Sequence, residues 1–209
     1  MEIVFRSAVL RDAPALATLI CLASQGHYPT TGFEFSLGGT REHQLAELAR
    51  LAAAGARTRF HFSHFEVAEV DGRVVASAAG FDQDRAEEQV PDALREIGWS
   101  EDAIQSLNQR LGEIYQEFPA EPPSCWTLDH VAVLPAHRHM GLARAVVERQ
   151  FARARAAGLH LCKLEVFRDN LKAISLYQSL GFVAGAPFCE EPLRRLMGRD
   201  AMVRMQVKI

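Results

Sequence analysis

A strand, a helix and a second strand follow one another closely in the second half of the chain, and this arrangement limits the fold more than any other feature. Apolar runs at 124–135 and 161–167 predict two buried strands. Between them, residues 141–157 predict a helix that ends at Gly158, a residue type typical of helix C-termini. Two strands joined in this way are expected to lie parallel, with a right-handed crossover.

The other segments predict antiparallel pairing around this unit. The clearest signal is the hairpin at 64–81, in which Asp71 and Gly72 form a two-residue turn between two strand-like runs. We therefore expect an α/β fold with a mixed, mostly antiparallel central sheet and helices on both of its faces. The other expected elements are strands at 2–8, 182–189 and 200–209, helices at 11–24, 40–55 and 170–180, and a loop at 25–39.

Length and composition predict one domain over residues 1–209. The net charge of −3 disfavours a general nucleic-acid binder, and no apolar run is long enough to span a membrane. No signal peptide is expected at the start of the chain. The four cysteines are scattered, which is typical of reduced thiols in a cytoplasmic protein.

Residues 83–122 differ from the rest of the chain because they hold ten acidic residues and only three arginines. The apolar spacing from Ile104 to Ile114 predicts a helix from Ser100 to about Phe118. We interpret the segment as an insertion between strands whose acidic helix packs on the surface with a solvated face. Two alternatives stay open: it could attract a cationic amine, or it could pack on a second subunit in a homodimer.

The stretch AHRHMGLA at 136–143 places cationic side chains and a glycine where a helix begins. Cations are usually better placed at the other end of a helix, because the dipole is positive at the N-terminus. Free backbone amides at a helix start bind anions, and Gly141 lets a phosphate approach the backbone. Arg138 adds donors suited to phosphate oxygens. The stretch therefore predicts a pyrophosphate-binding site.

Two blocks in this region resemble the GNAT superfamily of N-acetyltransferases. In VAVLPAHRHMGLA, Arg138, Gly141 and Ala143 fill the places of its acetyl-coenzyme A signature, with alanine where glycine is common. The block LEVFRDNLKAISLYQSLGF matches the next one through Glu165, Asn170, Tyr177, Leu180, Gly181 and Phe182. Together the blocks cover residues 126–182, and the insertion has no counterpart in the minimal pattern. The resemblance implies a GNAT-type fold.

The resemblance also implies transfer of an acetyl group from acetyl-CoA directly to a primary amine through a ternary complex. The strands would separate near Val131–Val133 and Val166 to admit the pantetheine arm. The amide of Ala132 or Val133 could polarise the thioester carbonyl. The implied cofactor-binding residues are Val131, Ala132, Val133, Arg138, His139, Met140, Gly141, Leu142, Ala143, Asn170 and Tyr177.

Three residues are candidates for acid–base chemistry. Tyr177 is the expected general acid, on the same helix face as Asn170. Glu165 is the leading base, because a carboxylate inside a strand needs a partner or a function and because it matches the acid of the branch that acetylates ribosomal-protein N-termini. An ion pair with Lys163 or Arg168 is the alternative for Glu165. Asp129 is a rival base, and His130 is expected on the other face as a satisfied core histidine.

The acceptor amine is the least constrained part of this prediction, and it can be a small molecule or a peptide or protein N-terminus. The loop 25–39 and residues 185–199 are expected to frame its pocket, with contributions from His27, Tyr28, Phe33, Phe35 and Phe188. His61 and His64 alone do not make a metal site, because no third ligand is in sight. Two other functions are weighed against the enzyme: a non-catalytic acetyl-CoA sensor, and an interaction protein led by the acidic insertion.

Overall fold

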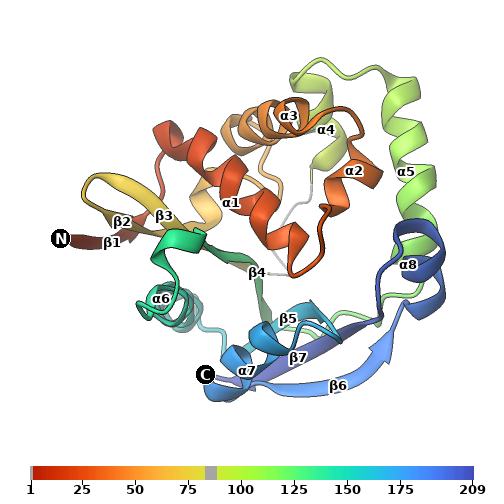
Figure 1. The fold of residues 1–209 in the computed structure, drawn as a ribbon. Coiled ribbons are helices and arrows are strands. Elements are labelled where there is room, and N and C mark those ends of the chain that lie inside the picture. The colour runs from red at the N-terminus through yellow and green to blue at the C-terminus, as the bar shows by residue number, and fades with distance from the viewer. Residues whose placement is uncertain (1, 83–88) are drawn as a thin grey trace.

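The computed structural model describes residues 2–82 and 89–209. Within these ranges the strands form one seven-stranded sheet in the order β1-β2-β3-β4-β5-β7-β6 (Figure 1). The pairing of β4 with β5 is parallel and the other five pairings are antiparallel, which confirms the predicted mixed sheet. The strands are β1 (Ile3–Ser7), β2 (Phe65–Val70), β3 (Arg73–Asp82), β4 (Cys125–Val133), β5 (Leu161–Phe167), β6 (Val183–Phe188) and β7 (Met202–Lys208).

Helices cover both faces of this sheet. They are α1 (Ala13–Gln25), α2 (Gly32–Ser36), α3 (Arg41–Ala53), α4 (Val90–Glu96), α5 (Glu101–Tyr115), α6 (Leu142–Ala156), α7 (Leu171–Ser179) and α8 (Glu190–Met197). One apolar cluster joins α6 and α7 to the sheet, and a second joins α1 and α3 to its other face. Among the described residues, no helix is long and apolar enough to cross a membrane.

Local sequence signals explain where many elements begin and end. The side chain of Thr40 accepts a hydrogen bond from the amide of His43 (3.3 Å) and caps α3. Ser100 caps α5 in the same way through the amide of Ala103 (3.3 Å). The β2–β3 hairpin turns at Asp71 and Gly72, whose φ angles of 47° and 80° are those of the predicted turn.

Besides α4, two short helices lie where none was predicted. Helix α2 lies inside the segment 25–39, which was expected to be a loop. Helix α8 lies inside residues 185–199, between the last two strands. Both pack against α5, so the three helices stand together beyond the end of the sheet (Figure 1).

The acidic insertion is more deeply packed than a surface helix with a solvated face. Residues 83–88 of the predicted insertion 83–122 lie outside the described residues. In the remainder, α4 and α5 bury Leu94 and Leu107 in the cluster that also holds Leu48 of α3. Near its other end, α5 buries Ile114 in a third cluster with Leu193 of α8. The described part of the insertion therefore connects the α1–α3 side of the molecule with the last strands.

Candidate active site

The parallel ladder between β4 and β5 is short. It pairs Cys125 with Leu161, Trp126 with Cys162 and Thr127 with Lys163. No further β4–β5 pair follows among the described residues, although β4 continues to Val133 and β5 to Phe167. The prediction placed the separation of the strands near Val131 and Val166, and pairing already ends at Thr127. This opening between the two strands is called the split below.

A β-bulge lies in β4 beside the split. Its register with β3 shifts between Ser77 and Ala79, so that His130 and Val131 together lie opposite Ala78. His130 carries the strain of this bulge, with a φ of 47°. Because of the extra residue, Asp129 and His130 lie on the same face of the sheet.

Two carboxylates flank the mouth of the split. Asp129 lies two residues beyond Thr127 on β4, and Glu165 lies two residues beyond Lys163 on β5. Since paired residues of parallel strands share a face and side chains alternate along a strand, both carboxylates lie on the face of Lys163.

Asp129 is held as a carboxylate by its surroundings. Burial raises the pKa of this carboxyl, but the charges of His130 and Arg59 and the hydrogen bond from the His130 amide (2.8 Å) outweigh burial, so the pKa is lowered. A guanidinium nitrogen of Arg59 lies 3.8 Å from its Oδ2. Asp129 can therefore accept a proton at neutral pH, and it is a weaker base than an unperturbed aspartate.

His130 differs from the predicted satisfied core histidine on the opposite face. Its ring stacks on Phe60 and Phe65, with centroids 5.2 and 6.2 Å away, on the side of the sheet that α1 covers. Its buried Nε2 has no hydrogen-bond partner among the described residues and lies 3.6 Å from Oδ2 of Asp129. Burial lowers the pKa of the imidazole, against the attraction of Asp129, which raises it. The correction follows from the bulge, which strict alternation along the strand does not foresee.

Glu165 has two cationic partners. Its Oε1 accepts hydrogen bonds from Nζ of Lys163 (3.1 Å) and Nε of Arg204 on β7 (2.8 Å). Lys163 was one of the two partners that the sequence offered as an alternative to catalysis. The other, Arg168, instead pairs with Asp200 and Glu190. Arg204 was not predicted at all, although it lies directly opposite Glu165 in the β5–β7 register.

Tyr177 approaches the split from the opposite face. It is 8% exposed and packs in the cluster that α6 and α7 form with the sheet. Its ring meets Phe182 edge to face, with centroids 5.7 Å apart. Burial raises the pKa of the phenol, and the negative charge of Asp129 raises it further, so the hydroxyl stays protonated at neutral pH. A protonated hydroxyl is the form that a general acid requires.

The helix start after β4 has the geometry of an anion site. Gly141 caps α6 with a φ of 76°, and no atom of the chain would lie within 4 Å of a Cβ there. The first backbone bond of the helix runs from the amide of Ala145 to the carbonyl of Gly141 (3.1 Å). The preceding amides, those of Leu142, Ala143 and Arg144, thus belong to the free first turn.

Arg138 hydrogen-bonds to its own chain through both its amide and its side chain. The amide of Arg138 donates to the carbonyl of Pro135 (3.4 Å), so it belongs to the turn before the helix rather than to the free amides. The Arg138 side chain is exposed and donates to the carbonyl of Val133 (3.4 Å). His139 has a φ of 66°, which turns the backbone toward the helix start. The available donors therefore begin after Arg138.

Asn170 lies where the prediction placed it, at the start of α7. Its Oδ1 accepts a hydrogen bond from the amide of Ala173 (3.4 Å) and caps the helix. Its Nδ2 lies beside Gly26, in the segment that follows α1. This contact brings the predicted acceptor loop to the same end of β5.

The predicted acceptor segments 25–39 and 185–199 meet each other at that end of β5. The buried Arg199 donates to the carbonyls of Ser24 (2.9 Å) and Thr30 (2.7 Å) and stacks on Tyr28 and Phe167. The Tyr28 hydroxyl also donates to Asp169 (2.7 Å).

The five residues suggested for the acceptor pocket separate into groups. Phe33 is buried in the α1–α3 cluster and is a core residue. Phe35 and Phe188 belong to the third cluster with α5 and α8. His27 and Tyr28 both contact Asp169 at the end of β5. His27 and Tyr28 therefore lie beside the residues that follow β5.

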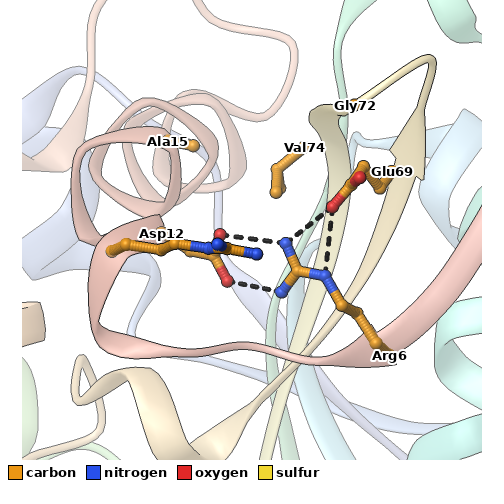
Figure 2. A pocket seen from close by; sticks show the side chains of 7 residues that line it. Arg6, Asp12, Ala15, Glu69, Gly72 and Val74 are labelled. Carbon is orange, nitrogen blue, oxygen red and sulfur yellow. Dashed lines mark hydrogen bonds and ion pairs between the residues drawn. The ribbon is translucent and has the colours of Figure 1, made fainter.

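A shallow pocket at the opposite end of α1 is not part of this site. Figure 2 shows Arg6 held between Asp12 and Glu69 in this pocket. Arg6 donates to both oxygens of Asp12 (2.6 and 3.0 Å) and to Oε2 of Glu69 (2.7 and 3.1 Å). Because these charges satisfy each other, the arrangement is a structural ion-pair network.

The four cysteines and His61 are buried side chains. All four cysteines are buried free thiols. His61 is buried, and its Nδ1 lies 2.8 Å from the hydroxyl of Ser63. No group of three or more His, Cys, Asp or Glu residues suited to a metal ion occurs in residues 2–82 and 89–209.

A known family model matches most of this chain. Residues 32–182 match the model of the acetyltransferase (GNAT) family. The chain belongs to this family. The match includes β4, α6, β5 and α7, and so includes the split, the anion site and Tyr177. It confirms the resemblance drawn from residues 126–182.

A curated GNAT relative matches part of this chain. The [ribosomal protein bS18]-alanine N-acetyltransferase of Escherichia coli K12 is 41% identical over 56 residues, which are 27% of this chain and 38% of that relative. The chain thus spans less than half the length of the curated relative it matches.

Two solved structures share the GNAT fold over nearly the whole chain. An N-acetyltransferase from Staphylococcus aureus Mu50 has a TM-score of 0.72 at 16% identity, covering 98% of this chain and 100% of that one. A structure from Salmonella typhimurium with its cofactor acetyl-CoA has a TM-score of 0.56 at 20% identity, covering 100% of this chain and 94% of that one.

Proposed function

We propose that this GNAT chain transfers an acetyl group from acetyl-CoA directly to a primary amine in a ternary complex. The observation that carries the proposal is the split itself. The β4–β5 ladder ends at Thr127 and Lys163, with Tyr177 on one face and Asp129 and Glu165 on the other. Chemistry that needs an acid and a base on opposite sides of one reacting centre fits this arrangement.

The residues around the split fit acetyl-CoA. The open space at Gly141 and the free amides from His139 to Ala143 suit a diphosphate. The edge of β4 at Val131, Ala132 and Val133 offers peptide groups to an extended arm, since β5 does not pair with it there. Asn170 and Tyr177 would line the side of the acetyl-CoA site that lies across from β4. When bound, acetyl-CoA supplies a thioester whose acyl group is activated toward amines.

Each catalytic residue has a defined task in this proposal. Glu165 accepts the proton that the acceptor ammonium must lose before it can react. Tyr177 donates a proton to the leaving thiolate, for which its raised pKa keeps it protonated. Asp129 is the alternative base, and its lowered pKa makes it a weaker proton acceptor than an unperturbed aspartate.

The acceptor that we propose is the amino group of a peptide or protein N-terminus, with small-molecule amines as the alternative. The support is the name of the E. coli relative, which acts on an alanine of a ribosomal protein. The loop around His27 and Tyr28 lies at the end of β5, where an acceptor would meet Glu165. A panel of N-terminal peptides and small amines, followed by release of free thiol, tests this class.

The decisive experiment is Tyr177→Phe. Because the change removes only the hydroxyl, acetyl-CoA affinity measured by calorimetry should change little, while kcat should fall by about 10²–10⁴. Phe182→Leu, a conservative change beside the same ring, is the control and should leave kcat within a few fold. A wild-type chain that binds acetyl-CoA and acetylates nothing in the panel would instead be a sensor module. Absence of acetyl-CoA binding would exclude both functions.

A cytoplasmic location belongs to this proposal as well. The support is that the four cysteines are free thiols, which a reducing compartment maintains. A homodimer is likewise part of the proposal, and light scattering on the purified chain tests it.

A further inference from the structure

The proposed base, Glu165, is one of four charged side chains that form a closed ring of ion pairs. Glu165 pairs with Lys163 (3.1 Å) and Arg204 (2.8 Å) through Oε1. Both cations also pair with Glu121, whose Oε2 lies 2.6 Å from Lys163 and whose Oε1 lies 2.9 Å from Arg204. Each cation therefore contacts both carboxylates.

The two cationic side chains of this ring are buried, whereas the side chain of Glu121 lies on its solvent-exposed side. The Lys163 side chain is 4% exposed and that of Arg204 is 9% exposed. Glu165 is 15% exposed and Glu121 is 39% exposed. Buried cations need counter-charges close by, because desolvation is costly for an unpaired ion. The ring supplies two negative charges for two positive ones.

The position of Glu121 depends on the acidic insertion. The preceding residue, Ala120, accepts a hydrogen bond from Arg204 through its carbonyl (2.7 Å). These residues follow α5, which is anchored on α3 at one end and on α8 near the other. The end of the insertion is thus fastened to β5 and β7 beside the split.

The charge balance around Glu165 depends on Glu121. Without Glu121, the Glu165 carboxylate would face Lys163 and Arg204 with no second anion directly paired to either. The charge of Lys163 also acts on Asp129, but the stronger electrostatic interactions of Asp129 are those with His130 and Arg59. Two unopposed cations hold a carboxylate in its charged form and make it a poorer proton acceptor.

We propose that Glu121 is a positioning residue that shares Lys163 and Arg204 with Glu165, and thereby keeps Glu165 basic enough to accept the proton of the acceptor amine. The inference rests on the proposed function, in which Glu165 is the base. It assigns a task to the acidic insertion, for which the family pattern offers none. In this arrangement Glu121 does not touch the reacting atoms.

The test is Glu121→Gln in the full-length chain, with an acceptor identified by the thiol-release panel. The change keeps the size of the side chain and removes its charge. The acidic limb of the kcat/KM profile should move to lower pH by about one unit, and kcat on the plateau should fall several-fold because the base is weaker. Glu121→Asp, which retains the charge, should restore most of the wild-type profile.

The matched control is Glu117→Gln, which removes the same charge from the same segment at an exposed position. Its profile should equal that of the wild type. A purely structural role of Glu121 would lower the melting temperature and leave the pH profile in place, which would overturn the inference. If Glu121→Gln does not fold, Glu121→Ala, which also removes the charge, serves the same comparison.

Glu165→Gln separates this inference from the proposed function. If Glu165→Gln loses activity while Glu121→Gln keeps the wild-type profile, the role of Glu121 is wrong and that of Glu165 stands. If Glu165→Gln keeps full activity, Glu165 is not the base and the inference fails with it, although acetyl transfer itself is still measured in the wild type.

Discussion

At the scale of single residues, Asp12 is an example of a charged side chain held by ion pairing at a buried position. Asp12 is 6% exposed and accepts hydrogen bonds from Arg6 and from the amide of Val9 (2.8 Å). Burial raises the pKa of its carboxyl, but these bonds and the charge of Arg6 outweigh burial and lower it below 3.8. Asp12 therefore contributes to stability in its ionised form.

The substitution Asp12→Asn tests this contribution. It should lower the free energy of unfolding by about 2 kcal/mol at pH 7, because Arg6 loses one of its two anions. A carboxyl with a depressed folded pKa stabilises the protein above the unfolded value near 3.8, and the effect is lost as pH falls through the folded value. Urea unfolding of both proteins should therefore show a gap at pH 7 that narrows toward pH 2.5.

Asp92→Asn is the control for that measurement, because Asp92 pairs with Arg95 on an exposed helix surface. Its gap should stay below about 1 kcal/mol at either pH. A gap for Asp12→Asn that is as large at pH 2.5 as at pH 7 would show that the substitution acts through packing.

The sequence identifies the proposed site residues more readily than it identifies the neighbours that contact them. Glu165, Asn170 and Tyr177 stand at fixed spacings within one short block, so a pattern can find them. Arg204 and Glu121 reach Glu165 from 39 residues downstream and 44 residues upstream, through the β5–β7 register and the end of the insertion. Only the folded register shows that these side chains meet.

At the scale of elements, helix α6 offers a matched pair of glycines. Gly141 before the helix has a φ of 76° and Gly158 after it has a φ of 79°. A Cβ at either position would meet no atom of the chain within 4 Å. The two positions thus differ in location and share their backbone conformation.

Alanine at each of these glycines separates backbone strain from cofactor binding. Both substitutions should lower stability by about 1–2 kcal/mol, because the left-handed conformation is strained for alanine. Only Gly141→Ala should raise the KM for acetyl-CoA, by about ten-fold, because its methyl group points into the proposed diphosphate site. Steady-state kinetics with varied acetyl-CoA measure the effect. Equal KM values for the two variants would contradict the site.

The missed helices α2 and α8 are short, and their signals lie in caps and ion pairs rather than in apolar periodicity. In α2, Thr31 and Glu34 form a capping box, a pattern that the residues TGFE at 31–34 already contain. In α8, Glu190 pairs with Arg194 and Glu191 with Arg195, four residues apart in each case. Gly32 at the first position of α2 and Pro192 inside α8 favour loops in sequence reasoning, and tertiary packing overrides that preference.

At the scale of the whole molecule, the sheet has two parts joined by a short parallel ladder. One part holds β1 to β4, and the other holds β5, β7 and β6. Helix α5 also links the two sides, through Leu107 in the α1–α3 cluster and Ile114 in the α8 cluster. The predicted strands and the parallel crossover are confirmed, because strong periodicity and turn residues mark them. The role of α5 as a link was not predictable, since its partners lie far away in sequence.

A ligand that binds across the split should stabilise the whole molecule. Acetyl-CoA at about 100 times its Kd should add about 2.7 kcal/mol to the free energy of unfolding. For a domain of this size that corresponds to a rise in Tm of about 5–10 °C. Thermal unfolding with acetyl-CoA should show this rise, and acetyl-pantetheine, which lacks the diphosphate, should give a much smaller one at the same concentration. Equal shifts for both compounds would contradict the anion site.

The part of β4 that does not pair with β5 affects which substitutions this protein can tolerate during evolution. In the proposed complex, an extended arm lying there would be held by peptide groups, which are the same whatever side chain a residue carries. Substitutions among aliphatic residues at Val131 or Val133 thus leave the bonding pattern intact. Proline at a position whose amide faces the gap removes a donor outright. We therefore expect exchanges among aliphatic residues to be tolerated along this edge of β4, and the loss of a single backbone N–H group not to be.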